Sequence, residues 1–174
     1  LLTENFNGAT NTWLKTNSST GGTPANAAWT LRPDGYILGG NTFHSNDNSQ
    51  FYHSNSDAQG SGSTTRTYLR SPAMNTTGYS SLSLEFYHFY RHYSNSTGYV
   101  QVSTDNTNWT TVQTYVADDG GNSNFTHQTI DLSAYVGNTT FYVRFYYYAT
   151  WGWYWAIDNV TVRGTSGSTI PIIN

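Results

Sequence analysis

The second half of the sequence is a series of short segments in which apolar and polar side chains alternate with a period of two. In residues 141–148, one parity holds Phe, Val, Phe and Tyr, and the other holds Tyr, Arg, Tyr and Tyr. Such alternation places successive side chains on opposite faces of a β-strand. No window shows the i, i+3, i+4, i+7 apolar spacing of an amphipathic helix. The pattern therefore predicts an all-β domain, either a sandwich or a barrel.

The expected strands lie at residues 2–6, 28–31, 68–71, 82–90, 98–103, 109–115, 126–132, 140–148 and 154–163. Residues 98–115 are predicted to form a hairpin, with its turn at Asp105-Asn-Thr-Asn108. Residues 39–63 are rich in Gly, Asn, Ser and Asp, and we expect a long loop there, of the kind that is usually functional or ion-bound. A single domain is expected over residues 1–164, followed by a linker-like tail at 165–174.

The composition restricts the partners of such a domain. Only 10% of the residues are charged and the formal net charge is −3, whereas about 25% charged residues is usual. Without a basic patch for phosphates, nucleic acid is not an expected partner. No stretch of 18 apolar residues predicts a membrane span, and the absence of cysteine excludes disulfides and thiolate metal sites. Scarce Lys with abundant Thr, Asn and Tyr favours a secreted or cell-surface location, and we expect a monomer within a multidomain chain.

The strands carry a second, mixed face beside their apolar one. If these strands share a sheet, the mixed positions form a tyrosine-rich platform on which a sugar ring could lie, with Glu, Gln and Arg meeting its hydroxyls. The alternative interpretation is that the tyrosines are half-buried packing residues. The predicted platform consists of Glu85, Tyr87, Tyr99, Gln101, Tyr142, Arg144 and Tyr146.

A second aromatic segment is Trp151-Gly-Trp153-Tyr-Trp155. In a strand the three tryptophans would share a face. We expect Trp155 to enter the core with Ile157. Trp151 and Trp153 either cap a loop or contact a ligand, and both remain ligand candidates.

Several segments together resemble a known family. They are Glu4-Asn5-Phe6, Tyr-Leu-Arg-Ser-Pro at 68–72, Ser-Leu-Ser-Leu-Glu-Phe at 81–86, Gly-Tyr-Val-Gln-Val-Ser-Thr-Asp at 98–105 with Trp109, and Trp-Ala-Ile-Asp-Asn-Val at 155–160. This order is similar to that of the MAM-like and cleaved-adhesin group of jelly-roll domains, which occur in secreted multidomain proteins of bacteria. The resemblance covers residues 2–163 and implies a jelly-roll β-sandwich of two antiparallel sheets.

The resemblance also implies a structural calcium. Its ligands in the group are an acidic residue on the first strand, one in the long early loop and the Asp of the closing motif. By position these match Glu4, Asp47 and Asp158, with Asp34 and Asp57 as other candidates for the second. Residues 46–49 (Asn-Asp-Asn-Ser) supply the oxygen ligands that calcium prefers. The alternative interpretation of that segment is a solvated turn.

No catalytic motif stands out. The sequence has no His-Glu-x-x-His and no Gly-x-Ser-x-Gly, and its two glutamates, Glu4 and Glu85, are not spaced as an acid–base pair. We therefore expect a non-catalytic binding module of a larger protein, with a polysaccharide or glycan as partner. The alternatives are a domain that adheres to a surface protein, or a structural accessory domain of a protease or glycosidase.

Overall fold

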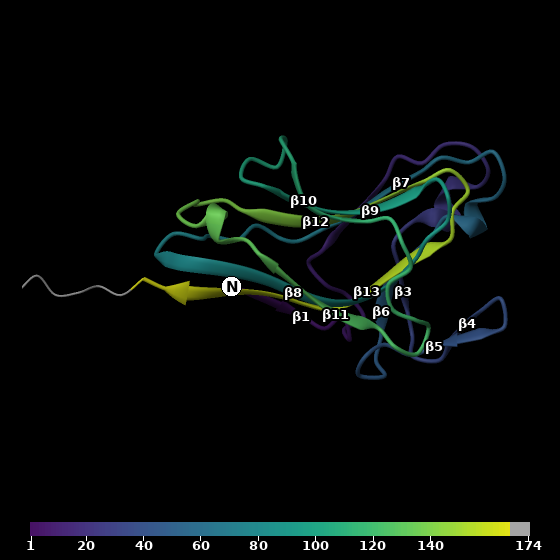
Figure 1. Cartoon of the computed structure of the whole chain (residues 1–174), viewed down its shortest axis with the longest axis horizontal. Coiled ribbons are helices and arrows are strands. Elements are labelled where there is room, and N and C mark those ends of the chain that lie inside the picture. Colours follow the sequence, from purple (N-terminus) through teal and green to yellow (C-terminus); the bar gives the residue numbers. More distant parts are fainter. Residues whose placement is uncertain (168–174) are drawn as a thin grey trace, which may run out of the picture.

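Two antiparallel β-sheets pack face to face in the computed structural model, which describes residues 1–167 (Figure 1). Sheet A has the strand order β11-β8-β13-β6-β3, with β1 also paired to β13, and sheet B has the order β10-β9-β12-β7-β2. The connections β7–β8, β8–β9, β10–β11, β11–β12 and β12–β13 each pass from one sheet to the other, as in a jelly roll. The predicted all-β sandwich is thereby confirmed.

The strands of sheet A are β1 (Leu2–Glu4), β3 (Thr30–Arg32), β6 (Phe51–Asn55), β8 (Tyr79–Arg91), β11 (Thr126–Asp131) and β13 (Tyr154–Ser166). Those of sheet B are β2 (Leu14–Asn17), β7 (Thr65–Arg70), β9 (Ser96–Ser103), β10 (Thr110–Tyr115) and β12 (Tyr142–Ala149). The helices in the described residues are short 3-10 turns, η1 (Pro24–Ala27), η2 (Asp57–Gln59) and η3 (Ser133–Tyr135). No helix in residues 1–167 is long and apolar enough to cross a membrane.

The core lies between the two sheets and takes the parity that the alternation predicts. Phe145 of β12 is fully buried and meets Phe86 of β8 edge to face, with ring centroids 5.0 Å apart. Trp155 of β13 is also fully buried and stands perpendicular to Phe145 at 5.7 Å. Edge-to-face pairs are a preferred aromatic geometry, and burying each ring stabilises the fold by about 1.5–3 kcal/mol. The prediction that Trp155 belongs to the core is confirmed.

A short hairpin of β4 (Tyr36–Leu38) and β5 (Asn41–Phe43) covers part of the outer face of sheet A. Figure 1 shows it near β3 and β6, on the side away from sheet B. Under it lies a second apolar cluster, separate from the main core. This second cluster consists of Phe43, Phe51, Phe89, Phe125, Tyr154 and Ala156.

The predicted long loop over residues 39–63 is wrong at its centre, because β6 is an interior strand of sheet A. All of its residues are buried, since the core covers one face and the β4–β5 hairpin covers the other. Its polar side chains are inside as well, and Ser54 Oγ donates to the carbonyl of Ala27 at 2.6 Å. A strand buried on both faces shows no apolar–polar alternation, so the period-two pattern could not reveal it.

The hairpin predicted at residues 98–115 is confirmed, with β9 paired to β10. Asp105 closes its turn, and its carboxylate accepts the backbone N–H groups of Thr107 (2.8 Å) and Asn108 (2.7 Å). Together with the side-chain amide of Asn108, the leading cause, these hydrogen bonds hold the pKa of Asp105 below its usual value.

At the end of the described chain, β13 continues through Ser166, past the predicted domain end at residue 164. The first two residues of the predicted tail therefore belong to the sheet. Residues 168–174 of that tail lie outside the described residues.

Candidate functional site

Asp158, one of the predicted metal ligands, lies at an irregularity in β13. The register against β8 shifts between Asp158 and Thr161, and Asn159 has a φ of 49°, in the left-handed region. The carboxylate of Asp158 is fully buried and accepts the backbone N–H of Asn159 at 2.8 Å. The bulge thus places a buried acidic side chain directly after the buried apolar residues Trp155, Ala156 and Ile157.

The loop at residues 45–50 brings Asp47 to the same place. Asn159 Nδ2 donates to Asp47 Oδ2 at 3.0 Å, and Ser45 Oγ donates to Asp47 Oδ1 at 3.0 Å. Ser49 Oγ lies within hydrogen-bond distance of both Asp47 Oδ1 and Asp158 Oδ2, the latter at 3.4 Å. We call Ser45, Asp47, Ser49, Asp158 and Asn159 the Asp47–Asp158 cluster.

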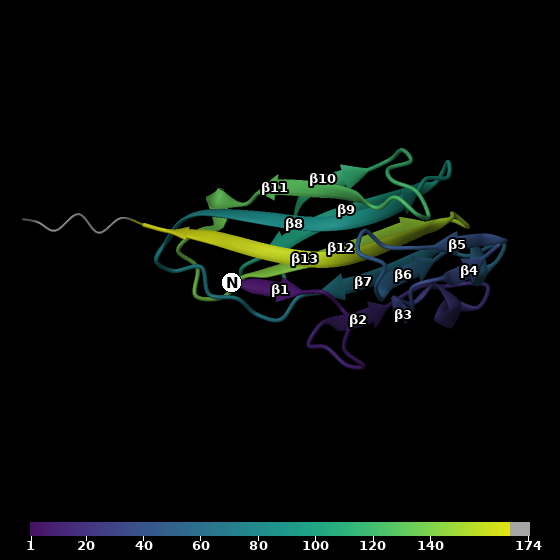
Figure 2. The same cartoon turned by 90° about the horizontal axis from the view of Figure 1, so that it is seen from below.

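Glu4, the third predicted ligand, does not join the cluster. It ends β1, which runs along β13 (Figure 2). Its Oε1 accepts the backbone N–H of Phe6 at 2.8 Å, so the carboxylate closes a turn of its own chain. Within residues 1–167, no three acidic or histidine side chains gather closely enough to hold a metal ion. The other candidates lie elsewhere, since Asp34 contacts His44 at 2.9 Å and Asp57 lies beside Trp153.

The donors in the cluster suit calcium. Carboxylate, hydroxyl and amide oxygens are the hard ligands that calcium prefers. Burial raises the pKa of Asp158 to about 7, and the neighbouring charge of Asp47 acts in the same direction. No Lys or Arg in the described part of the chain forms an ion pair with either carboxylate. A buried carboxylate without a counter-charge is costly, and a cation would supply that charge.

The outer face of sheet B carries a row of stacked tyrosines. Tyr68, Tyr146 and Tyr99 are register partners on β7, β12 and β9. The ring centroids are 4.5 Å apart for Tyr68–Tyr146 and 5.2 Å for Tyr99–Tyr146, with interplanar angles of 13° and 19°. These separations match the strand spacing of about 4.8 Å, so the rings stand upright against one another. Tyr146 has a ring stacked against each of its faces, so it offers its hydroxyl edge and not a flat face, unlike the predicted platform.

Arginines fill the neighbouring rows of that face. The Arg144 guanidinium lies 4.0 Å from the ring of Trp109 and 4.7 Å from that of Tyr68, and Arg144 Nε donates to Gln101 Oε1 at 2.8 Å. Arg70 lies 4.8 Å from the ring of Tyr142. The arginine–tyrosine face, as we call it, consists of Arg66, Tyr68, Arg70, Tyr99, Gln101, Trp109, Tyr142, Arg144, Tyr146 and Tyr148.

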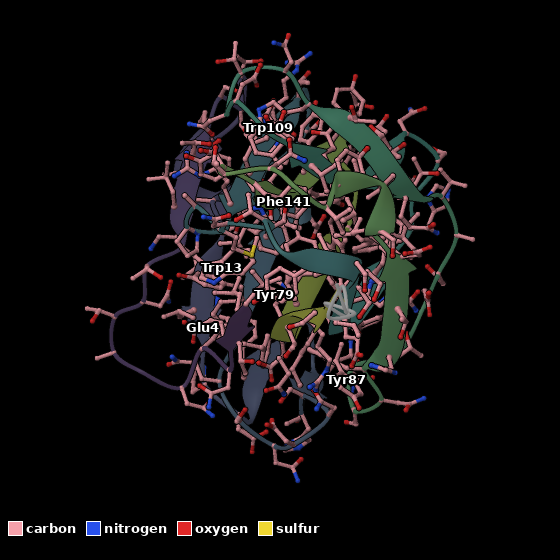
Figure 3. The ribbon with its side chains drawn as sticks, turned by 90° about the vertical axis from the view of Figure 1, so that its left-hand side faces the viewer. Glu4, Trp13, Tyr79, Tyr87, Trp109 and Phe141 are labelled. Carbon is pink, nitrogen blue, oxygen red and sulfur yellow. The ribbon has the colours of Figure 1, made fainter. Side chains whose placement is uncertain are left out.

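Glu85 and Tyr87 do not belong to this face, which corrects the predicted platform. Both are on β8 in sheet A, and Figure 3 shows Tyr87 and Trp109 on opposite sides of the sandwich. Tyr87 packs against His127 at 4.8 Å, and Glu85 Oε1 lies 3.4 Å from Arg163 Nε. Their off-core parity was predicted correctly, but alternation does not say to which sheet a strand belongs.

β13 begins near one end of the sandwich (Figure 1), and Trp151 and Trp153 lie in the turn directly before it. Trp151 is 48% exposed and has a φ of 49°, a strained conformation for a bulky residue. The turn is held in place by its backbone, because Gly152 N–H donates to Ser56 Oγ at 3.0 Å and Ser56 N–H donates to the carbonyl of Trp153 at 2.8 Å. A Cβ on Gly152 would lie 2.9 Å from Cβ of Ala149, so only glycine lets the turn pack this closely.

Trp153 stands between two hollows. One, of about 210 Å³, is lined by Asp57, Tyr93, Trp151, Gly152 and Trp153. The other, of about 410 Å³, shares Asp57 and Trp153 and adds Leu38, Gly39, Asn41, Arg91 and Tyr154. The Arg91 guanidinium lies 4.5 Å from the Trp153 ring, and Tyr93, itself 50% exposed, meets that ring edge-on at 6.1 Å. We call Asp57, Arg91, Tyr93, Trp151 and Trp153 the apex site.

Comparison with solved structures shows that the fold of this chain is known from other proteins. The K3 cleaved adhesin domain of Lys-gingipain from Porphyromonas gingivalis superposes with a TM-score of 0.63 at 17% identity, covering 94% of this chain and 98% of that chain. The K2 domain of Lys-gingipain gives a TM-score of 0.60 at 18% identity, covering 95% and 98%. The chain has the fold of the cleaved adhesin domains. No family model matches the sequence, and the comparison with curated proteins finds no match.

The cleaved-adhesin type of fold implied by the resemblance is thus confirmed, while identities this low leave the ligand open. Sequence reasoning missed several residues of both surfaces. Tyr68 and Arg70 were detectable, because β7 alternates Tyr and Arg with the buried Thr67 and Leu69. Asp57 and Tyr93 were not, since each reaches the apex site from a separate turn with no periodic pattern.

Proposed function

We propose that this chain is a non-catalytic carbohydrate-binding module of a larger secreted or cell-surface bacterial protein, and that it binds its glycan at the apex site. The observation that carries the proposal is the exposed Trp151 on a turn fixed by backbone hydrogen bonds. Aromatic side chains beside a few convergent polar groups are typical of small-ligand sites. An anchor that is already ordered loses little conformational entropy on binding.

The polar groups of the apex site suit sugar hydroxyls. Arg91 supplies N–H donors beside the Trp153 ring, and it also donates to the Tyr154 hydroxyl at 3.3 Å. Asp57 supplies an acceptor, and within residues 1–167 its carboxylate forms no ion pair. The exposed Trp151 and Tyr93 rings offer apolar surfaces for the C–H face of a sugar.

The Asp47–Asp158 cluster is proposed to hold a structural calcium. Asp47 and Asp158 would be its carboxylate ligands, with Ser45, Ser49 and Asn159 around them, and Glu4 would remain outside the ligand set. When bound, the ion supplies positive charge to a buried acidic pair. The residues themselves join the loop before β6 to the bulge of β13, within sheet A.

The apex proposal is tested by affinity electrophoresis against soluble neutral polysaccharides such as xylan, galactan and mixed-linkage glucan. Trp151→Ala should abolish retardation by whichever polymer the wild-type domain binds, because its exposed ring is the anchor. Leu14→Ala is the matched control, since Leu14 is 46% exposed on β2, and it should bind like the wild type. Thermal melting checks that both variants fold. Equal binding by Trp151→Ala and the wild type would remove the apex site from consideration.

Protein adhesion is the second candidate, because the solved structures with this fold are described as adhesin domains. A wild-type domain that binds no neutral polysaccharide but is retained by a cell-surface protein, and loses that retention in Trp151→Ala, would favour it. Retention of neither kind would leave a structural accessory domain as the better proposal.

A further inference from the structure

The arginine–tyrosine face gathers positive charge in an acidic protein. The chain has seven Lys and Arg residues and a net charge of −3, yet Arg66, Arg70 and Arg144 all lie on this face of sheet B. Within residues 1–167, none of the three forms an ion pair with a carboxylate. Arg163, on the other sheet, shows the usual arrangement, with Glu85 at 3.4 Å.

Arg70 and Arg144 are direct register partners on β7 and β12. Their Cα atoms are therefore about 5 Å apart, and like charges directly opposite each other destabilise a sheet. The fold holds them with neutral groups only. Arg70 donates to Asn106 Oδ1 at 2.8 Å and to the Ser71 carbonyl at 3.2 Å, while Arg144 donates to Gln101 Oε1 at 2.8 Å.

Most of the guanidinium donors on this face are unused by the protein. Each guanidinium carries five N–H donors in a planar fork. In the described residues, Arg144 uses only Nε, Arg70 uses Nε and one terminal nitrogen, and Arg66 donates no side-chain hydrogen bond. Aromatic rings hold the forks in position without using those N–H groups. Such preoriented forks match carboxylate and sulfate groups, which they bind through paired hydrogen bonds.

We propose that the arginine–tyrosine face binds an anionic polysaccharide, whose carboxylate or sulfate groups contact Arg70 and Arg144 and whose hydroxyls contact the upright tyrosine edges. Arg66 lies four residues along β7 from Arg70, about 13 Å away, so the charges follow a line that an extended chain can follow. The Tyr68–Tyr146–Tyr99 row crosses the space between them with hydroxyls outward.

The test is affinity electrophoresis or calorimetry with dextran sulfate for the sulfate source, polygalacturonate for the carboxylate source and dextran as the neutral control. The wild-type domain should bind at least one anionic polymer and not dextran, more weakly at about 200 mM than at about 20 mM salt. Arg70→Gln and Arg144→Gln should each weaken binding about tenfold, as expected for a lost charge-assisted hydrogen-bonded pair.

Arg163→Gln is the matched control, because it removes the same charge from sheet A. It should change binding by less than about twofold at moderate salt, since exposed charges beyond a Debye length are screened. Trp151→Ala should bind the anionic polymer normally, which separates this proposal from the apex site. Arg70→Lys keeps the charge but removes the planar fork. If it restores less than half of the affinity that Arg70→Gln loses, the result would support recognition by the fork.

Three outcomes would overturn the proposal. They are the absence of binding to either anionic polymer, equal weakening by Arg163→Gln and Arg70→Gln, and binding of single-stranded nucleic acid in preference to both polysaccharides. Circular dichroism melting of each variant guards against loss of fold, and Arg70→Lys covers the case in which Arg144→Gln does not fold.

Discussion

The outer faces of the two sheets start from the same alternation but end differently. Sheet A has apolar residues at outward positions, such as Phe51 and Phe89, and the β4–β5 hairpin buries them. Sheet B has Tyr, Arg and Gln at its outward positions, and its face remains half-exposed. The comparison shows that the type of the outward-pointing side chains decides whether a further segment has to pack over a sheet face. A bare face must satisfy its side chains with one another, as the stacked tyrosines and arginines do.

The largest effect should come from removing the centre of the cover. Phe43 is fully buried and contacts the rings of Tyr154 (5.4 Å), Phe89 (5.9 Å) and Phe51 (6.1 Å). Phe43→Ala should reduce the free energy of unfolding by about 3–5 kcal/mol, measured by urea denaturation. Tyr146→Ala, on the bare face, should cost less than half as much. A Phe43→Ala loss no larger than that of Tyr146→Ala would show that the hairpin does not act as a cover.

Calcium binding should give the next largest change in the free energy of unfolding, and this change should depend on the cluster in sheet A. Saturating calcium should raise the free energy of unfolding by about 2.7 kcal/mol at a hundredfold excess over Kd, and EDTA should remove the gain. Magnesium should not replace calcium, because it demands a tighter octahedron. Asp158→Asn should abolish the response, whereas Asp131→Asn, an exposed carboxylate elsewhere on sheet A, should keep it. A melting temperature that ignores both calcium and EDTA in the wild type contradicts the proposed site.

A smaller effect should come from pH, through His53 under the hairpin. Both of its ring nitrogens lack a hydrogen-bond partner in the described residues. Burial lowers its pKa to about 3, and nearby Arg32 acts in the same direction. Below pH 6.5 the His53 side chain of the unfolded chain binds a proton, whereas that of the folded chain does so only near pH 3. The free energy of unfolding therefore falls as the pH drops from 6.5 to about 3.

Between pH 7 and pH 5, His53 should account for a loss of about 2 kcal/mol. The measurement is the difference in unfolding free energy between the wild type and His53→Leu at each pH, because the other titrating groups then cancel. A pH dependence that persists in full in His53→Leu would place its origin at another group.

Much of the fold followed from the sequence, because the strands of the second half each have one face in the core and one outside. The parity of β12 and the turn at Asp105 were predictable for this reason. β6 was not, since it is buried on both faces and its buried histidine and serine imitate a loop composition. The grouping of Tyr87 with Tyr99 failed because parity is a property of one strand, whereas sheet membership depends on pairing between distant strands.

The candidate sites were predictable only where a single strand or turn supplies the residues. Trp151 and Trp153 belong to one turn and were recognised, but Asp57 comes from η2, Arg91 from the end of β8 and Tyr93 from the turn that follows it. Asp47 and Asp158 were matched by position within a resemblance. Glu4 matched equally well, yet in the described residues its carboxylate accepts the Phe6 N–H and does not gather with the two aspartates, an arrangement that positional matching cannot detect.

The left-handed backbone of Trp151 sets two selection pressures against each other. Glycine or asparagine would adopt a φ of 49° with less strain than tryptophan. A library of variants at this position selected for heat resistance alone should therefore accumulate glycine and asparagine. One selected for retention on a polysaccharide column should keep an aromatic ring and accept the lower melting temperature. The residue that dominates in each pool would show whether thermal stability or polysaccharide binding accounts for tryptophan at this position.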